Sequence, residues 1–174
     1  WIAGNLGADV ATGLVDTAVL PTADDLKAAS IEGSWAVTLT VTDPGGFRNL
    51  TGQLSRTYVL TRDCTVDPCV LTLTAETANG TRTLPVTYVD GVYSAEEPDL
   101  GTQDCLLADG TISVPGGLRN STIISFITVA AVLDNGAWRA TGLSGTVTET
   151  ATQIAGATGQ CQAGTATFAF DANR

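Results

Sequence analysis

Residues 33–42, with the sequence GSWAVTLTVT, decide the fold class of this chain. Large apolar side chains occupy every second position from Trp35 to Val41, and alanine or threonine occupies the positions between them. Successive side chains of a β-strand point to opposite faces, so this alternation predicts a strand with one buried and one solvated face. The stretch therefore favours an antiparallel sheet that covers a single core.

The same alternation recurs along the rest of the chain. We predict strands over 33–43, 53–62, 69–77, 81–89, 92–97, 104–108, 111–115, 122–134, 137–149 and 163–171. Asn-Gly or Asp-Gly pairs at 79–80, 90–91, 109–110 and 135–136 fall between strands, and such pairs favour two-residue hairpin turns. Each strand should then pair with the next. The sequence thus predicts an all-β, up-and-down antiparallel meander that closes into a barrel of about eight to ten strands.

Residues 1–31 lack this alternation, and we treat them as an N-terminal arm that precedes a disulfide-bonded β-barrel domain over residues 32–174. Within the arm, residues 22–29 predict a short helix. Thr22 is its expected N-cap, and two aspartates follow near the positive end of the helix dipole. Strand 122–134 is apolar on both faces, so we expect this helix to cover its outer side.

The start of the arm is apolar, with Trp1, Ile2 and Leu6 among its first residues. Exposed apolar side chains are costly in water, so these residues are candidates for an assembly arm that docks on a neighbouring copy. The chain begins at Trp1 and contains no methionine, which indicates a processed product.

The four cysteines predict two disulfides. Cys64 and Cys69 flank a short turn between two strand-like runs, so we pair them, which leaves Cys105 to pair with Cys161. A zinc site is the alternative, but the CxxC knuckles typical of such sites are absent. Disulfides indicate an extracytoplasmic protein, secreted or attached to the cell surface. No apolar run is long enough to predict a transmembrane segment.

Charge and composition exclude several classes of function. Eight basic and eighteen acidic residues give a net charge of −10, which argues against nucleic acid as a partner. The chain has no histidine, so Ser-His-Asp and Cys-His catalysis and histidine metal sites are excluded. We therefore expect no enzyme, no cofactor and no metal. A calcium site at Glu96, Glu97, Asp99 and Asp104 is an alternative, but without Asp-x-Asp spacing a solvated loop is favoured.

The motif Gly33-Ser34-Trp35 at the start of the first strand resembles the lipocalin and wider calycin pattern. In that family the tryptophan closes the barrel floor and stacks against an arginine from a late strand. The resemblance implies this role for Trp35, with Trp138 and Arg139 on the late strand and Arg139 as the stacking arginine.

Residues 31–172 also resemble secreted β-barrel domains of actinobacterial lipoproteins and surface proteins. The shared features are the Gly-x-Trp-x-Val-x-Leu-x-Val opening, the Cys-x4-Cys turn, the Trp-Arg-Ala-Thr-Gly strand and the Cys-x4-Ala-x-Phe closing strand. This resemblance implies a lipocalin-like barrel on the cell surface.

Arg56 and Tyr58 are the candidate ligand-facing residues, because they share a strand face with Leu54 and Leu60. Arg56 would bind an anion inside the barrel; the alternative is an arginine that extends to the rim. We therefore predict a non-catalytic binding domain for a small apolar or anionic ligand, or for a cell-envelope component. The alternative is a structural or assembly subunit of a surface complex or filament that associates through the arm.

Overall fold

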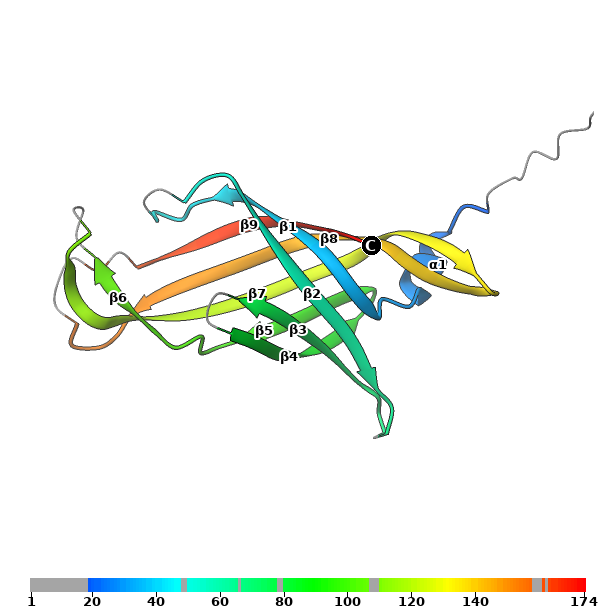
Figure 1. Cartoon of the computed structure of the whole chain (residues 1–174), viewed down its shortest axis with the longest axis horizontal. Coiled ribbons are helices and arrows are strands. Elements are labelled where there is room, and N and C mark those ends of the chain that lie inside the picture. The colour runs from blue at the N-terminus through cyan, green and yellow to red at the C-terminus, as the bar shows by residue number, and fades with distance from the viewer. Residues whose placement is uncertain are drawn as a thin grey trace, which may run out of the picture.

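The computed structural model describes residues 19–47, 50–65, 67–77, 80–106, 110–157, 161 and 163–174 (Figure 1). These residues form one short helix and an all-β sheet, as predicted. The elements are α1 (Ala23–Ala28), β1 (Gly33–Asp43), β2 (Gln53–Asp63), β3 (Val70–Thr77), β4 (Gly80–Val89), β5 (Val92–Glu97), β6 (Thr102–Leu106), β7 (Ile112–Asp134), β8 (Ala137–Gln153) and β9 (Gly164–Asn173).

The described strands form one antiparallel sheet in the order β5-β4-β3-β2-β1-β9-β8-β7-β6. A further pairing joins β5 to β7, with Ser94 opposite Ser125. This pairing closes β1 to β5 and β7 to β9 into a ring of hydrogen bonds, and β6 lies outside the ring on β7. Strand twist makes such closure possible, because it turns the two edges of the sheet toward each other.

The prediction that each strand pairs with the next is wrong at one place. β5 pairs with β7 and not with β6, because β7 runs unbroken through residues 112–134 and is long enough to pair with both. The sequence pattern instead predicts two strands there, over 111–115 and 122–134. Gly116 has a φ of 59°, a conformation that glycine adopts readily, so the chain bends there and the strand continues.

Tight turns join β4 to β5 and β7 to β8 as the sequence predicted. Asp90 and Gly91 have φ values of 51° and 91°, and Asn135 and Gly136 have φ values of 50° and 81°. Positive φ at both central residues is the requirement that Asn-Gly and Asp-Gly pairs meet best. The other two pairs include Asn79 and Asp109, which lie outside the described residues.

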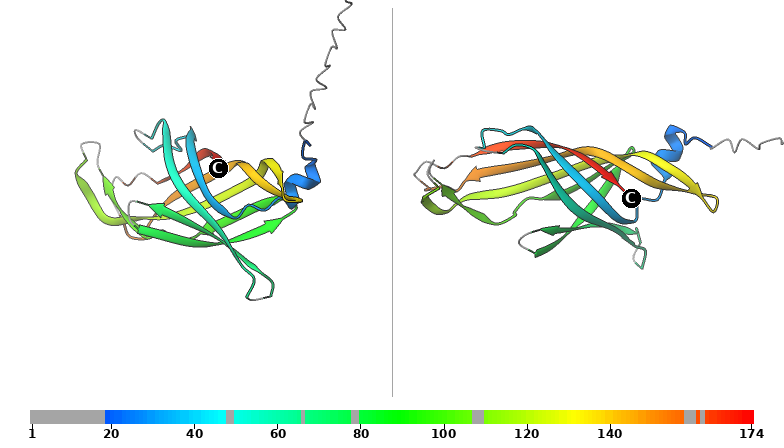
Figure 2. Two further views of the ribbon diagram at one scale, coloured as in Figure 1. Left: turned by 45° about the vertical axis from the view of Figure 1, so that its right-hand side comes forward. Right: turned by 45° about the horizontal axis from the view of Figure 1, so that its top comes forward.

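The predicted helix is confirmed as α1, with a capping box at its start. The Thr22 hydroxyl accepts a hydrogen bond from the Asp25 amide, and the Asp25 carboxylate accepts one from the Thr22 amide at 2.8 Å. Figures 1 and 2 show α1 beside the β7–β8 hairpin at one end of the sheet, with β6 at the opposite end.

The segment after α1 belongs to the core of the sheet. Ala29 and Ile31 are buried in the main apolar cluster, and Ser30 exchanges backbone hydrogen bonds with Trp138 and Ala140 of β8. The helix thus packs at the end of the ring. It leaves Ile123 and Val129 on the outer face of β7 47% and 48% exposed, so the expectation that it covers this face is wrong.

Candidate ligand-binding cavity

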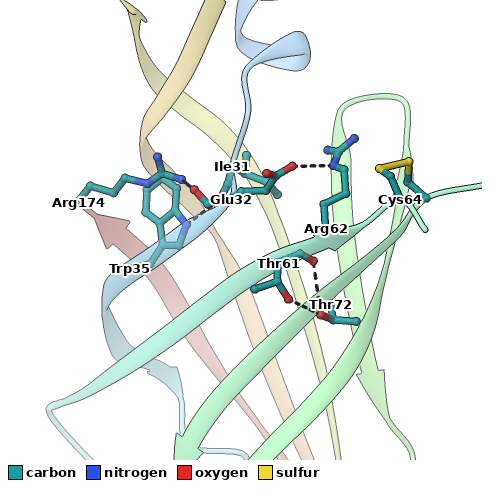
Figure 3. A network of polar contacts seen from close by, with 9 residues as sticks. Ile31, Glu32, Trp35, Thr61, Arg62, Cys64, Thr72 and Arg174 are labelled. Carbon is teal, nitrogen blue, oxygen red and sulfur yellow. Dashed lines mark hydrogen bonds and ion pairs between the residues drawn. A yellow bond between two sulfur atoms is a disulfide. The ribbon is translucent and has the colours of Figure 1, made fainter. Parts of the chain in front are cut away.

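Trp35 closes the end of the ring next to α1 (Figure 3). It lies on the inward face of β1 and is 1% exposed, and its indole Nε1 donates a hydrogen bond to the Ile31 carbonyl at 2.9 Å. The guanidinium of Arg174 lies over its ring, 4.4 Å from the centroid, and donates to the Glu32 carbonyl. Glu32 in turn pairs with Arg62 at 2.8 Å.

The arginine that stacks on Trp35 is therefore Arg174, and the assignment of this position to Arg139 is wrong. Strand register explains the difference: Asn173 lies opposite Ala36, which brings Arg174 beside Trp35. Arg139 lies on the outer part of β8 and pairs with Asp134 at 3.0 Å. Trp138, its neighbour, is partly buried against the core.

A row of aromatic rings fills the interior beyond Trp35. Tyr93 stacks on Phe126 with centroids 5.3 Å apart, Phe126 on Phe170 at 5.5 Å, and Phe170 on Tyr58 at 6.0 Å. The rings come from β5, β7, β9 and β2, so the row crosses the ring from side to side. Offset ring pairs of this kind add to the stability that burial supplies.

Beyond this aromatic row the interior is open, as a cavity of about 280 Å³. Most of its lining is apolar and comes from opposite sides of the ring. The lining residues are Leu39, Arg56, Tyr58, Ala75, Arg82, Leu84, Leu100, Thr122, Ile124, Val147 and Glu149. The interior is thus filled next to α1 and hollow toward the other end.

Three charged side chains line this cavity. Arg56 of β2 donates a hydrogen bond to the Ser55 carbonyl at 3.1 Å, and Arg82 of β4 donates to the Leu100 carbonyl at 3.2 Å. Glu149 of β8 lies between the inward-facing Val147 and Ala151. No described carboxylate lies within 4.0 Å of either guanidinium. These charges therefore face the cavity without an ion-pair partner among the described residues.

The surrounding walls change the acidity of two of the lining groups. Glu149 is exposed, but the walls of the cavity withdraw enough water to raise the pKa of its carboxyl, and the positive charge of Arg56 opposes this rise. Burial likewise raises the pKa of the Tyr58 hydroxyl, which has no hydrogen-bond partner among the described residues. Tyr58 therefore remains a neutral hydrogen-bond donor at neutral pH.

A second cavity of about 240 Å³ adjoins the first and shares Leu100 and Glu149 with it. Phe47 and Leu50 of the β1–β2 connection and Ala166 at the start of β9 also line it. These residues lie at the end of the ring away from Trp35. The second cavity is thus the mouth of the first.

The structure places both predicted ligand-facing residues, Arg56 and Tyr58, in the lining of this cavity. Arg82 and Glu149 were missed as site residues, although a signal was present. Arg82 shares the alternation of Leu84 and Val86, and Glu149 follows Val147 by two positions. The sequence pattern does not predict how the ring closes, and this closure makes β4 and β8 face the same cavity.

The two disulfides are those predicted, Cys64–Cys69 and Cys105–Cys161. The second joins β6 to the chain just before β9, next to Gly117 of β7. It therefore holds β6 at the mouth end of the ring.

The acidic side chains considered for calcium mainly stabilise backbone. Asp99 accepts a hydrogen bond from the Gly101 amide at 2.9 Å, and Asp104 accepts one from the Gly116 amide at 2.7 Å. Within the described ranges no group of three or more histidine, cysteine, aspartate or glutamate side chains is placed to hold a metal ion.

The assembly-arm residues Trp1, Ile2 and Leu6 lie outside the described residues. In the part of the chain that the structure describes, no helix has the length and apolarity needed to cross a membrane. The chain matches no family model, and comparison with curated proteins and with solved structures finds none that is similar to it.

Proposed function

We propose that this chain is an extracytoplasmic, non-catalytic binding domain that holds a small apolar or anionic ligand inside a lipocalin-like β-barrel. The observation that carries the proposal is the cavity of about 280 Å³ inside the ring of strands, with its apolar walls and a few polar groups. Ligand sites in proteins have this composition, since apolar walls supply affinity and a few polar groups set orientation.

The ring of hydrogen bonds supports the barrel in this proposal. Eight strands are the number at which a closed sheet has an interior just wide enough for side chains or one small ligand. Trp35 at the closed end, with an arginine over its ring, agrees with the lipocalin-like resemblance. We therefore propose that the chain is a surface domain of the actinobacterial type that it resembles, and that the ligand enters at the open end of the ring.

The disulfides support the proposed extracytoplasmic location, and the side chains of the cavity support a non-catalytic role. Two disulfides favour an oxidising compartment, outside the cytoplasm. The chain contains no histidine, and the charged side chains of the cavity are arginine and glutamate. Binding of a small molecule or of a cell-envelope component fits this set better than group transfer does.

A neutral apolar dye tests this function. N-phenyl-1-naphthylamine becomes fluorescent in apolar surroundings, and we expect it to bind at one site that extends from the cavity of about 280 Å³ into the adjoining mouth of about 240 Å³. Ala75→Phe places a large side chain in the cavity and should abolish binding. Ala36→Phe makes the same change on the exposed face of β1 and should leave binding intact. Equal binding by both variants, or none by the unmodified protein, would contradict the proposed function.

A second candidate is an assembly subunit of a surface complex or filament. It is favoured by the exposed apolar side chains on the outer face of β7, Ile123, Ile127 and Val129. Light scattering over a range of protein concentrations tests it. Oligomers that the double substitution Ile127→Ser, Val129→Ser converts to monomers would favour this function, and a monomer at all concentrations would exclude it.

A further inference from the structure

The lining of the cavity has a net positive charge, whereas the net charge of the chain is negative. The chain has a net charge of −10, yet the cavity lining holds two arginines and one glutamate. When all three are ionised, one positive charge is left without compensation. Because a partly enclosed site solvates charge poorly, a bound group with one negative charge would find its complement there.

Both arginines line the same cavity, and they enter it from β2 and β4, the two neighbours of β3 in the sheet. Arg82 is partly buried, and its bond to the Leu100 carbonyl fixes it at the junction of the two cavities. Arg56 lies one inward position closer to the mouth than Tyr58 on β2. Guanidinium groups offer several N–H donors in a plane and suit the two oxygens of a carboxylate.

The size of the cavity limits the ligand. An engineered protein cavity of about 150 Å³ holds benzene, and one water-sized group takes about 30 Å³. The cavity of about 280 Å³ thus holds roughly nine such groups. Tyr58 and the aromatic row close its deep end, so a long chain cannot extend further into the ring.

The geometry points to a compact amphipathic monoanion as the ligand, with its acid group between Arg56 and Arg82 and its apolar part among Leu84, Ile124 and Val147. This inference rests on the proposed function, since it names the class of ligand for the same cavity. It gives the charged groups distinct roles: Arg56 and Arg82 attract the acid group, and Glu149 excludes a second negative charge.

Three probes of one chain length test the inference: octanoate, 1-octanol and octylammonium, each titrated into the full chain by calorimetry at pH 7. We expect octanoate to bind at least tenfold more tightly than either of the others. Arg56→Gln and Arg82→Gln should each weaken octanoate binding by about tenfold, because each removes a charge-assisted hydrogen bond. Octanol binding should be unchanged. Glu149→Gln should strengthen octanoate binding.

Arg119→Gln is the matched control, because Arg119 is an exposed arginine outside the cavity that pairs with Asp99. It should bind octanoate as the unmodified protein does. Melting curves and dye binding establish that each variant keeps its fold and its cavity. If the dye binds and octanoate binds no better than octanol or octylammonium, the inference is wrong while the proposed function stands. If no dye binds, the proposed function itself fails.

Discussion

At the scale of single residues, Trp35 and the charged groups of the cavity have opposite surroundings. Trp35 is fully enclosed, its Nε1 is bonded to a backbone carbonyl, and Arg174 covers its ring. Arg56, Arg82 and Glu149 instead line an open cavity, and none of the three forms an ion pair within 4.0 Å with another described residue. Trp35 and its partners therefore fill one end of the ring, whereas the three charged side chains line the open cavity.

Replacing Arg174 tests the contact over Trp35. A cation over an aromatic ring contributes about 0.5–2 kcal/mol, depending on how far it is desolvated. We expect Arg174→Ala to lower the free energy of unfolding by about 1 kcal/mol, measured by urea denaturation. Arg139→Ala is the control and should cost less, because an exposed ion pair contributes little. Equal losses in the two variants would show that Arg174 does not stabilise the closed end.

Glu149 should make the stability of the protein depend on pH. Its carboxyl has a raised pKa in the folded protein, so it binds its proton more tightly there than in the unfolded chain. Its contribution to stability is fully present below the ordinary pKa of 4.5 and is lost as the pH rises through the folded-state value. The variant Glu149→Gln has no carboxyl to ionise at this position, so its stability should not fall for this reason as the pH rises.

Urea denaturation at pH 4 and at pH 7 measures this effect. Relative to the unmodified protein, Glu149→Gln should gain stability at pH 7 but not at pH 4. Glu96→Gln, which removes an exposed carboxyl from β5, corrects for the change in net charge. A gain at pH 4 that equals the gain at pH 7 would contradict the assignment of the raised pKa to Glu149.

At the scale of elements, β7 and β8 form the longest pairing in the sheet. Gly145 of β8 lies opposite Phe126, at the level of the aromatic row. A Cβ atom at Gly145 would lie 2.0 Å from the Ser125 carbonyl oxygen and 2.6 Å from the Phe126 Cα. Glycine is therefore required there for the two backbones to approach as closely as they do.

Gly145→Ala should consequently destabilise the sheet. Forced overpacking of this kind costs about 1–3 kcal/mol, and thermal unfolding should reveal the loss. Gly142→Ala is the matched control on the same strand. Its added Cβ would meet the Ala130 Cβ at 3.2 Å and the Val129 Cγ2 at 3.4 Å, so a shift of a few tenths of an ångström would relieve the contact. If Gly142→Ala were the more harmful change, the close approach at Gly145 would not limit the pairing.

Sequence patterning predicted most elements but not all of their partners. Alternation from Trp35 to Val41 is a local property, so the strand bounds could be read directly. The β5–β7 pairing could not, because it depends on the length of β7 and on a bend at Gly116 that resembles a strand break in the sequence. The Arg174 contact likewise depends on the register between β1 and β9.

The candidate site was predicted in part for the same reason. The two-residue period places Arg56 and Tyr58 on an inward face, and it does the same for Arg82 and Glu149. It does not say at which depth of the ring each side chain lies. The depth of a side chain in the ring depends on the stagger between neighbouring strands. This stagger places the aromatic row in one part of the interior and the charged groups in the other.

At the scale of the whole molecule, the strands form a closed ring that is filled next to α1 and hollow at the other end. The ring brings cationic groups from β2 and β4 to face one space with a carboxylate from β8, inside a chain that is otherwise strongly acidic. We propose that a ligand binds at this hollow end of the ring.

A crystal structure with bound 8-bromooctanoate tests this proposal, because bromine is located by its anomalous scattering. We expect β5 and β7 to be paired, the bromine to lie inside the ring near Leu84 and Ile124, and the carboxylate to lie between Arg56 and Arg82. A collapsed interior, or bromine found on the outer surface alone, would contradict the proposal.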